Sequence, residues 1–401
     1  MGEVGRYIVR NQCGKIGIDP EKIRKGDLPK LSQLLSETMA TFGADKARRV
    51  KEGISRLHSL EAIVDDEKDP ARQMEGLYSL GELSRLCSDF DTALTYFERL
   101  ADLSSDFGNQ HKRALSYLGI GMVRNDMSDG FMALDSFERA LELANKIGDR
   151  LLLARIYYGI GRCHLRKGDY EKALRYYAKS LDMGKDDPGL ASQLKMDIGL
   201  VHDALGDYPM ALLCIQEAID IASGGAQVYD VARMYNNLGE VHKHLGNYEE
   251  AIKKYKISLD KAQSIKNDRI AAYALSNIAE CHVKTGNAGE ARGLLERALD
   301  MACKSRDEYI VGSVYLALGV AYGKDHDLNA MNDSFDKAEK TFKRIQSPYD
   351  LGVSFFEHGK ALKSVKKRAE AKIALTKALA IFKEIKSIKF VQQAERELDD
   401  L

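Results

Sequence analysis

The chain has 401 residues, of which 44% are hydrophobic and 30% are charged. This length allows two or three average domains. Because 60 Lys and Arg residues balance 60 Asp and Glu residues, no excess charge is left to attract nucleic acid or an anionic membrane surface. Only six prolines, no tryptophan and abundant Leu, Ala, Glu and Lys favour helix over strand. We therefore expect an all-α protein that binds neither nucleic acid nor membrane.

The six cysteines are scattered, and none belongs to a C-x-x-C pair or stands beside a histidine at ligand spacing. This pattern is typical of reduced thiols and argues against disulfides or a zinc site. No apolar run approaches the roughly 18 residues of a transmembrane helix, and the first residues lack the hydrophobic stretch of a signal peptide. We expect a cytoplasmic protein.

Residues 1–66 come first and follow no repeat. Ile18-Asp19-Pro20 and Gly26-Asp27-Leu28-Pro29 have the Asp caps and first-turn prolines of helix starts. Between Leu31 and Phe42 the apolar residues then follow helical spacing. This predicts a small helical module, which either caps the following repeats or serves as a docking or dimerisation element. The second alternative leaves a homo-oligomer open.

A repeat of 40 residues follows and continues to about residue 387. Its first mark is a small residue at Gly81, Gly121, Gly161, Gly199, Gly239, Ala279, Gly319 and Gly359. Twelve residues after each stands Ala93, Ala133, Ala173, Ala211, Ala251, Ala291, Met331 or Ala371. One interval, from Gly161 to Gly199, is 38 residues instead of 40. A period of this length indicates an array of stacked hairpins.

Each repeat is predicted to be a helix, a tight turn and a second helix. In Gly168-Asp169-Tyr170 the glycine suits the left-handed end of one helix, and the aspartate can cap the next. The small residues let the two helices approach closely. Ser128-Asp129-Gly130, His326-Asp327-Leu328 and Lys366-Lys367-Arg368 replace this turn in three repeats, where we expect less regular packing. At Pro188 we expect a shortened inter-repeat turn.

This pattern of a small residue, an aromatic after Gly-Asp, and Ala at +12 and +19 resembles the tetratricopeptide repeat over residues 70–387. The usual unit has about 34 residues; the longer unit is similar to those of Pins-type adaptors, kinesin light chains and Rap-type regulators. The resemblance implies a right-handed α-solenoid, or superhelix, of about eight hairpins. The expected division is an N-terminal helical module over 1–66, a solenoid over 67–387 and a capping helix over 388–401.

No enzyme signature accompanies the repeat, so we predict no catalytic residues and no cofactor. The most suggestive set is a ladder of one histidine per repeat: His164, His202, His242 and His282. Helices in successive repeats lie about 8–10 Å apart, whereas metal–nitrogen bonds of about 2 Å require ligands that converge. We predict no metal site, and the resemblance implies that this position holds a packing residue.

The resemblance also implies that the first helices line a concave groove. The residues at its inward positions are Arg155, Tyr158, Arg162, Arg166, Arg233, Asn236, Asn237, Glu240, Lys243, His244, Asn277, Glu280 and Lys284. Arginines can grip carboxylates with two hydrogen bonds. Asn237 and Asn277 stand at equivalent positions, where amides can pair with the N–H and C=O groups of an extended peptide.

These features favour a non-enzymatic adaptor or scaffold that binds a partner peptide or helix carrying an acidic segment. The alternative is a Rap-like signalling regulator, in which the N-terminal module binds an effector and the groove binds a regulatory peptide. A third alternative is a scaffold that acts by self-association, and the polar inner face can also be solvated without a ligand. The Lys and Asn set of the chaperone-type carboxylate clamp is not reproduced.

Overall fold

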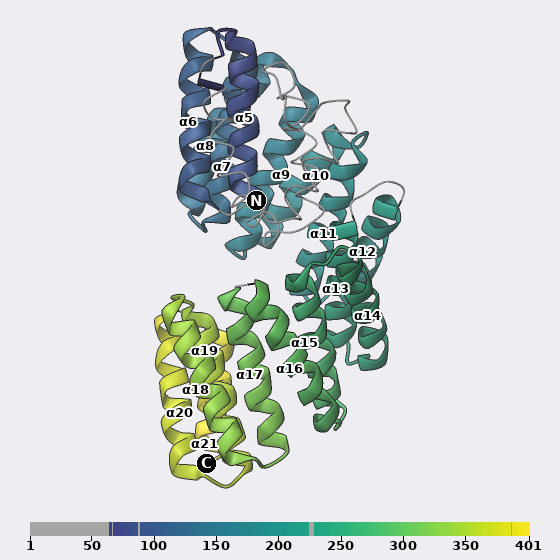
Figure 1. Ribbon diagram of the computed structural model, residues 1–401, viewed down its shortest axis with the longest axis vertical. Coiled ribbons are helices and arrows are strands. Elements are labelled where there is room, and N and C mark those ends of the chain that lie inside the picture. The colour runs from purple at the N-terminus through teal and green to yellow at the C-terminus, as the bar shows by residue number, and fades with distance from the viewer. Residues whose placement is uncertain (1–63, 66, 87–88, 224–227, 306, 386) are drawn as a thin grey trace, which may run out of the picture. The chain divides into compact units, whose positions relative to one another are not determined.

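The computed structural model describes residues 64–65, 67–86, 89–223, 228–305, 307–385 and 387–401. Within these ranges every regular element is an α-helix, as Figure 1 shows. The prediction of an all-α protein built of consecutive helix pairs is therefore confirmed. The helical module expected over residues 1–66 lies almost entirely outside the described residues, so it stays a prediction.

The helices alternate between first and second members of successive hairpins. The first helices are α5 Pro70–Leu86, α7 Gln110–Asp126, α9 Arg150–Arg166, α11 Pro188–Ala204, α13 Val228–His244, α15 Asp268–Lys284, α17 Glu308–Lys324 and α19 Pro348–Ser364. The second helices are α6 Phe90–Asp106, α8 Gly130–Ile147, α10 Tyr170–Gly184, α12 Tyr208–Ser223, α14 Tyr248–Ser264, α16 Ala288–Ser305, α18 Leu328–Arg344 and α20 Arg368–Glu384. A last helix, α21 Ile388–Asp399, packs on α20.

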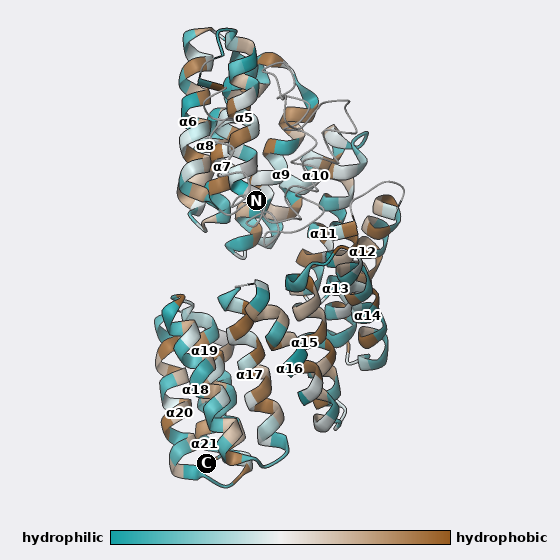
Figure 2. Ribbon diagram, in the orientation of Figure 1, coloured by the Kyte–Doolittle hydropathy of each residue, from teal (hydrophilic) through white to brown (hydrophobic). Residues whose placement is uncertain are grey.

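The chain divides into two compact units, which meet in sequence at Asn237 and Leu238, within α13. Within each unit, first helices pack on their own second helices, as α9 does on α10 and α15 on α16, and on the next first helix, as α9 does on α11 and α15 on α17. Figure 2 shows hydrophobic and hydrophilic residues interspersed along the same helices. This is the pattern expected when each helix buries one side against its neighbours. The sequence shows no composition change at the point of division.

The repeated glycines make room for a buried ring from the second helix. Phe137 on α8 has no exposed surface, and a Cβ atom placed on Gly121 would lie 2.6 Å from its ring. A Cβ on Gly159, in the next repeat, would lie 2.5 Å from the same ring. Phe97 fits in the same way between Gly81 and Gly119. Each ring therefore locks its own hairpin to the following one.

The turns are more uniform than the sequence suggests. Gly168 and Gly206 have φ values of 76° and 79°, and Ser128, His326 and Lys366 adopt the same left-handed conformation at 66°, 59° and 64°. At Ser128 the next amide donates to a carbonyl five residues back, as it does after Gly168. The turn backbone is therefore as regular in these repeats as in the others, because the hydrogen bonds fix it even without glycine, and the expectation of less regular packing stays a prediction.

The expected capping of the second helix is found in some turns only. Asp207 accepts a hydrogen bond from the Met210 amide at 3.4 Å, whereas Asp169 makes no side-chain cap and lies 3.2 Å from the His164 ring. Aspartates cap first helices at shorter distances, as Asp149 does for the Leu152 amide at 3.0 Å. Caps therefore stabilise the start of several repeats, but not that of α19, where Ser347 makes no side-chain cap.

The 38-residue interval has a different origin from the one expected. Between α10 and α11 lie three residues, the same number as between α14 and α15. The shortfall lies in α10, which has 15 residues where α6 has 17 and α8 has 18. The predicted shortening of the inter-repeat turn is wrong, and a second helix is shortened instead.

A matched pair of glycines tests the role of the left-handed turn. Gly286 has a φ of 88°, Gly289 has an ordinary helical φ, and neither has an atom within 4 Å of an added Cβ. We expect Gly286→Ala to lower the free energy of unfolding by about 1–2 kcal/mol, the cost of a left-handed L-residue. Gly289→Ala should raise it by about 0.5–1 kcal/mol, since alanine restricts the unfolded chain. Urea denaturation followed by circular dichroism measures both; changes of the same sign would contradict the assignment.

Candidate peptide-binding face

Helix α9 presents three arginines along one side, because Arg155, Arg162 and Arg166 are separated by about two turns and one turn. Their side chains are 47%, 25% and 42% exposed. Arg155 lies 3.5 Å from Asp187, and Arg162 and Arg166 lie 3.6 and 3.8 Å from Asp126. Charge-assisted hydrogen bonds usually measure about 2.7–2.9 Å, so these pairs are loose and leave guanidinium donors available.

The first part of α13 adds a second set of polar side chains in the same unit. Arg233 is 44% exposed and lies 3.7 Å from Asp230, again a loose pair. Asn236 and Asn237 follow within one turn and are partly exposed. Both groups of residues are thus partly exposed in the structure, and whether they bind a ligand stays a prediction.

Tyr158, expected on the same face, lies beneath it instead. It is 8% exposed and its ring packs against that of Tyr177, with centroids 6.1 Å apart. The guanidinium of Arg162 lies over the Tyr158 ring at 5.8 Å. Tyr158 therefore supports Arg162 from below, so its contribution to the face is to position that arginine.

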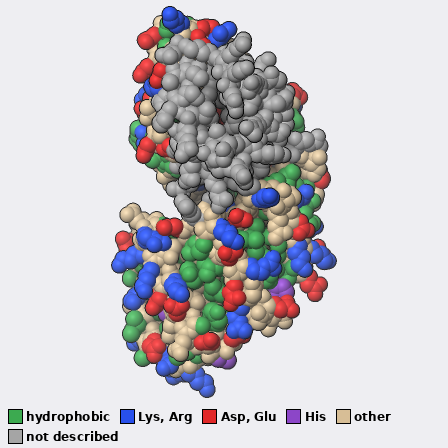
Figure 3. Space-filling model, in the orientation of Figure 1, with side chains coloured by type: hydrophobic (Ala, Val, Ile, Leu, Met, Phe, Trp, Pro, Cys, Tyr) green, Lys and Arg blue, Asp and Glu red, His purple; other side chains and the backbone are tan. Residues whose placement is uncertain are grey.

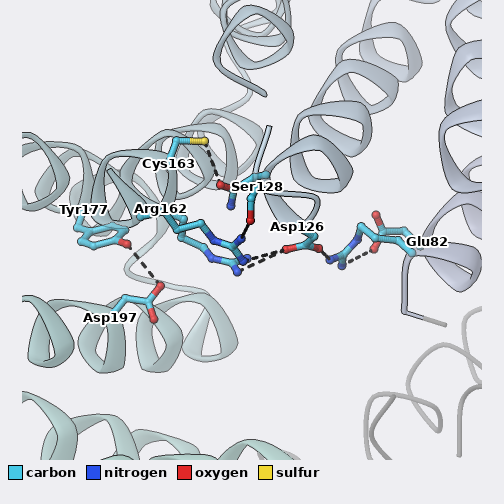
Figure 4. A network of polar contacts seen from close by, with 10 residues as sticks. Glu82, Asp126, Ser128, Arg162, Cys163, Tyr177 and Asp197 are labelled. Carbon is cyan, nitrogen blue, oxygen red and sulfur yellow. Dashed lines mark hydrogen bonds and ion pairs between the residues drawn. The ribbon is translucent and has the colours of Figure 1, made fainter. Parts of the chain in front are cut away.

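A buried carboxylate, Asp197 on α11, completes this layer, as Figure 4 shows. It is 5% exposed and accepts a hydrogen bond from the Tyr177 hydroxyl at 3.5 Å. Burial raises the pKa of Asp197, and this outweighs the opposite influence of Arg162 and Arg233 and the hydrogen bonds of Tyr158 and Tyr177. Sequence reasoning missed this residue, although it stands 40 residues before Asn237 in the same register.

The raised pKa of Asp197 predicts a pH-dependent effect of Asp197→Asn. Between the unfolded pKa of about 3.9 and the higher folded value, the folded chain holds the proton more tightly, so wild-type stability falls as pH rises through this window. Asparagine does not titrate. We expect the variant to gain stability relative to wild type at pH 7 and to lose that gain near pH 4. Urea midpoints at both values test this, with the exposed Asp182→Asn as control; an equal gain at both pH values would contradict it.

A network of charged side chains connects α5, α7 and α9 (Figure 4). Arg85 donates to Asp126 at 2.9 Å and to Glu82 at 3.1 Å, and all three side chains are less than a quarter exposed. Arg166 also donates to the Ser128 hydroxyl at 3.3 Å. Asp126 is thus shared by arginines from two repeats, which explains why Arg162 and Arg166 stay loosely held.

In the second unit the predicted charged residues mostly pair with one another. Lys243 donates to Glu240 and Glu280, each at 2.9 Å, and Glu240 also accepts from the Tyr255 hydroxyl at 2.8 Å. Burial alone would lower the pKa of Lys243, but the two glutamates raise it above its ordinary value. Glu240, Lys243 and Glu280 therefore form a structural ion-pair cluster, with few donors left for a ligand.

The other predicted residues of this unit differ in exposure. His244 and Lys284 are exposed, and Asn277 is partly exposed. Figure 3 shows basic and acidic side chains interspersed on the face seen in that view. None of the described helices combines the length and apolar character that crossing a membrane requires.

Three of the four ladder histidines lie close to a carboxylate of their own repeat. His164 lies 3.2 Å from Asp169, His202 lies 3.2 Å from Asp207, and His282 lies 3.2 Å from Glu290. The His164 ring also stacks on Tyr176 at 5.5 Å. Among the described residues no group of three or more His, Cys, Asp or Glu side chains is arranged to hold a metal ion. Packing and local polar contacts account for these three histidines, whereas the buried Nδ1 of His242 has no hydrogen-bond partner among the described residues.

Comparison with known protein families supports the resemblance to the tetratricopeptide repeat. Residues 112–186 and 230–304 match the family model described as tetratricopeptide repeat. These two segments are tetratricopeptide repeats. The matched segments fall on α7 to α10 and on α13 to α16, the helices that carry most of the predicted binding residues. Among curated protein sequences, none matches this chain.

Three solved structures of other proteins share its fold. A Rap protein in complex with Competence and Sporulation Factor is 17% identical, with a TM-score of 0.62 over 91% of this chain and 99% of that chain. The quorum sensor NprR from B. thuringiensis is 16% identical, with a TM-score of 0.64 over 83% of this chain and 94% of that one. Aspartyl phosphate phosphatase F from Bacillus subtilis is 16% identical, with a TM-score of 0.59 over 84% and 93%. Such low identities establish a common fold and no more.

Proposed function

We propose that this protein is a non-enzymatic cytoplasmic adaptor that binds an acidic segment of a partner on the arginine face. We define the arginine face as Arg155, Arg162 and Arg166 on α9 together with Arg233, Asn236 and Asn237 on α13. The observation that carries the proposal is that all four arginines are partly exposed and that their ion pairs, at 3.5–3.8 Å, are loose. Their donors are available to a partner's carboxylates.

The chemistry of this face favours an acidic peptide. A carboxylate can accept two parallel hydrogen bonds from one guanidinium, which lysine cannot supply. The amides of Asn236 and Asn237 can donate to and accept from peptide groups. Since salt screens exposed charges over roughly 8–10 Å, binding should weaken as the salt concentration rises.

The shared fold does not decide whether the protein is an enzyme, because one of the similar structures is an aspartyl phosphate phosphatase. The proposal of a non-enzymatic role rests on the local chemistry. Burial raises the pKa of the Cys163 thiol to about 11, so it is a poor nucleophile at neutral pH. Burial likewise raises the pKa of Asp197 beneath the arginine face. Burial thus disfavours the ionised form of both groups, and nucleophilic attack requires that form.

A Rap-like signalling regulator is the second candidate. The likeness in fold to a Rap protein over 91% of this chain favours it. In this version residues 1–66 bind an effector, and the arginine face binds a regulatory peptide. Deleting residues 1–66 and measuring both folding and partner capture separates the candidates. Full capture by the folded remainder favours the adaptor, and loss of capture favours the regulator.

Capture from native extract tests the proposal directly. The full chain is immobilised beside the variant Arg162→Ala with Asn237→Ala, and beside Arg175→Ala on α10, whose arginine is exposed but lies outside the face. We expect the double variant to lose a partner that wild type and the control retain. Equal recovery by all three proteins, with unchanged helical signal, would remove the arginine face as the binding site.

A further inference from the structure

A small pocket opens at the turn end of the second and third repeats. It has a volume of about 350 Å³ and is lined by Asn125, Ser128, Gly130, Cys163, Arg166 and Lys167. These residues come from the end of α7, the turn that follows, the start of α8 and the end of α9. Only Arg166 belongs also to the arginine face. The pocket is thus a neighbouring feature with its own lining.

The floor of the pocket holds a buried amide with a free donor. Asn125 is 1% exposed, and its Oδ1 accepts a hydrogen bond from the Cys163 thiol at 3.3 Å. Its Nδ2 group has no hydrogen-bond partner among the described residues. Buried polar groups are nearly always paired in native structures. An unpaired buried donor that lines a cavity therefore indicates that an acceptor binds there.

The neighbouring thiol fixes which end of the Asn125 amide faces the pocket. Burial raises the pKa of Cys163 to about 11, so the thiol keeps its proton at neutral pH and acts as the donor. The thiol donates to the oxygen of Asn125, so the N–H groups of the amide are directed away from Cys163. Cys163 serves here as a positioning residue.

Two cations and a hydroxyl complete the lining. Arg166 donates to Ser128 at 3.3 Å and lies 3.8 Å from Asp126. The Lys167 side chain lies against the start of α8. A Cβ atom placed on Gly130 would lie 3.1 Å from Cε and 3.9 Å from Nζ of Lys167. The start of a helix itself favours negative charge. Asp126 lies near Arg166 but is shared with Arg85 and Arg162, so the pocket keeps a net positive charge that suits a carboxylate.

We propose that this pocket binds the carboxylate of a peptide terminus, with Asn125 Nδ2, Ser128, Arg166 and Lys167 as its donors. The inference rests on the proposed function, because it assigns to the partner segment one group that it must carry. A volume of about 350 Å³ holds a terminal residue together with its carboxylate. The donors surround a space at the edge of the arginine face, so a chain lying along that face can end here.

The test uses the full chain and N-acetylglycine, a minimal peptide terminus. Ligand-observed saturation-transfer NMR measures its dissociation constant beside N-acetylglycinamide, acetate and inorganic phosphate at constant ionic strength. We expect saturable millimolar binding of N-acetylglycine, weaker binding of acetate and phosphate, and none of the amide. Absence of saturable N-acetylglycine binding, or equal binding of the amide, would overturn the proposal. Acetate binding as tightly would assign the pocket to a free carboxylate, and tighter phosphate binding would assign it to phosphate; either result overturns it.

Substitutions of the lining residues test whether N-acetylglycine binds in this pocket. Asn125→Asp replaces the donor by an oxygen acceptor at nearly constant shape, and Arg166→Gln and Lys167→Gln each remove one positive charge. We expect Asn125→Asp to abolish binding and each glutamine variant to raise the dissociation constant at least about tenfold. Lys185→Gln, an exposed lysine at the other end of α10, should leave it unchanged. If Asn125→Asp fails to fold, the variants at the exposed residues Arg166 and Lys167 still show whether the pocket is the binding site. Because no partner is needed, failure here is distinct from failure of the capture experiment.

Discussion

Phe137→Ala should lower the free energy of unfolding by about 3–5 kcal/mol, the usual cost of removing a large buried ring. Phe137 has no exposed surface, and its ring fills the space that Gly121 and Gly159 leave on two successive first helices. Alanine would open a cavity in both the second hairpin and its junction with the third. Because the glycines carry no side chain, neither neighbour can fill that cavity.

A control for this substitution lies on the same helix. Phe131 on α8 is 79% exposed, so Phe131→Ala should change the stability by no more than about 0.5 kcal/mol. Urea denaturation followed by circular dichroism compares the two variants with wild type. A small loss for Phe137→Ala, or equal losses for both variants, would contradict the role assigned to the ring.

Replacing Arg155, Arg162 and Arg166 together by glutamine should weaken binding of the captured partner at least about a hundredfold. Hydrogen bonds to charged groups contribute about 1.5–3 kcal/mol each, so the loss of two such bonds accounts for that factor. The three side chains share one side of α9, and their present ion pairs are too long to hold them fully. A partner carboxylate therefore meets little competition.

Isothermal titration calorimetry with the purified partner measures this effect. The matched control is Arg139→Gln with Arg175→Gln, which removes two exposed arginines from the second helices α8 and α10. We expect the control to bind like wild type and the affinity of wild type to fall with added salt. A triple variant that binds as tightly as the control would exclude the arginines of α9 from the interface.

The fold could be predicted from the sequence because one period recurs through most of it. Small residues such as Gly121 and Gly161 mark each first helix, and local contacts suffice to build a hairpin from them. The prediction was incomplete about what the glycines contact. Gly119 and Gly159, two positions before the marker, accommodate the ring of the preceding repeat, and this requires knowledge of how neighbouring hairpins pack.

The candidate site was predictable only in part. Helical spacing correctly placed Arg155 and Arg166 at exposed positions, because a single helix fixes that relationship. It wrongly placed Tyr158 at the surface, since burial there depends on Tyr177 and Asp197 from other helices. Lys243 likewise forms an ion pair with Glu280 of the next repeat, a contact that the spacing within one helix does not reveal. Contacts between repeats decide which polar residues remain available.

Site-specific photo-cross-linking tests the central claim most directly. A benzophenone amino acid is placed at position 155 on α9 in one full-length protein and at position 175 on α10 in another, both exposed in the structure. If a partner segment lies on the arginine face, the captured partner will cross-link from position 155 and not from position 175. Cross-linking from position 175 alone would place the partner on the second helices and contradict the account.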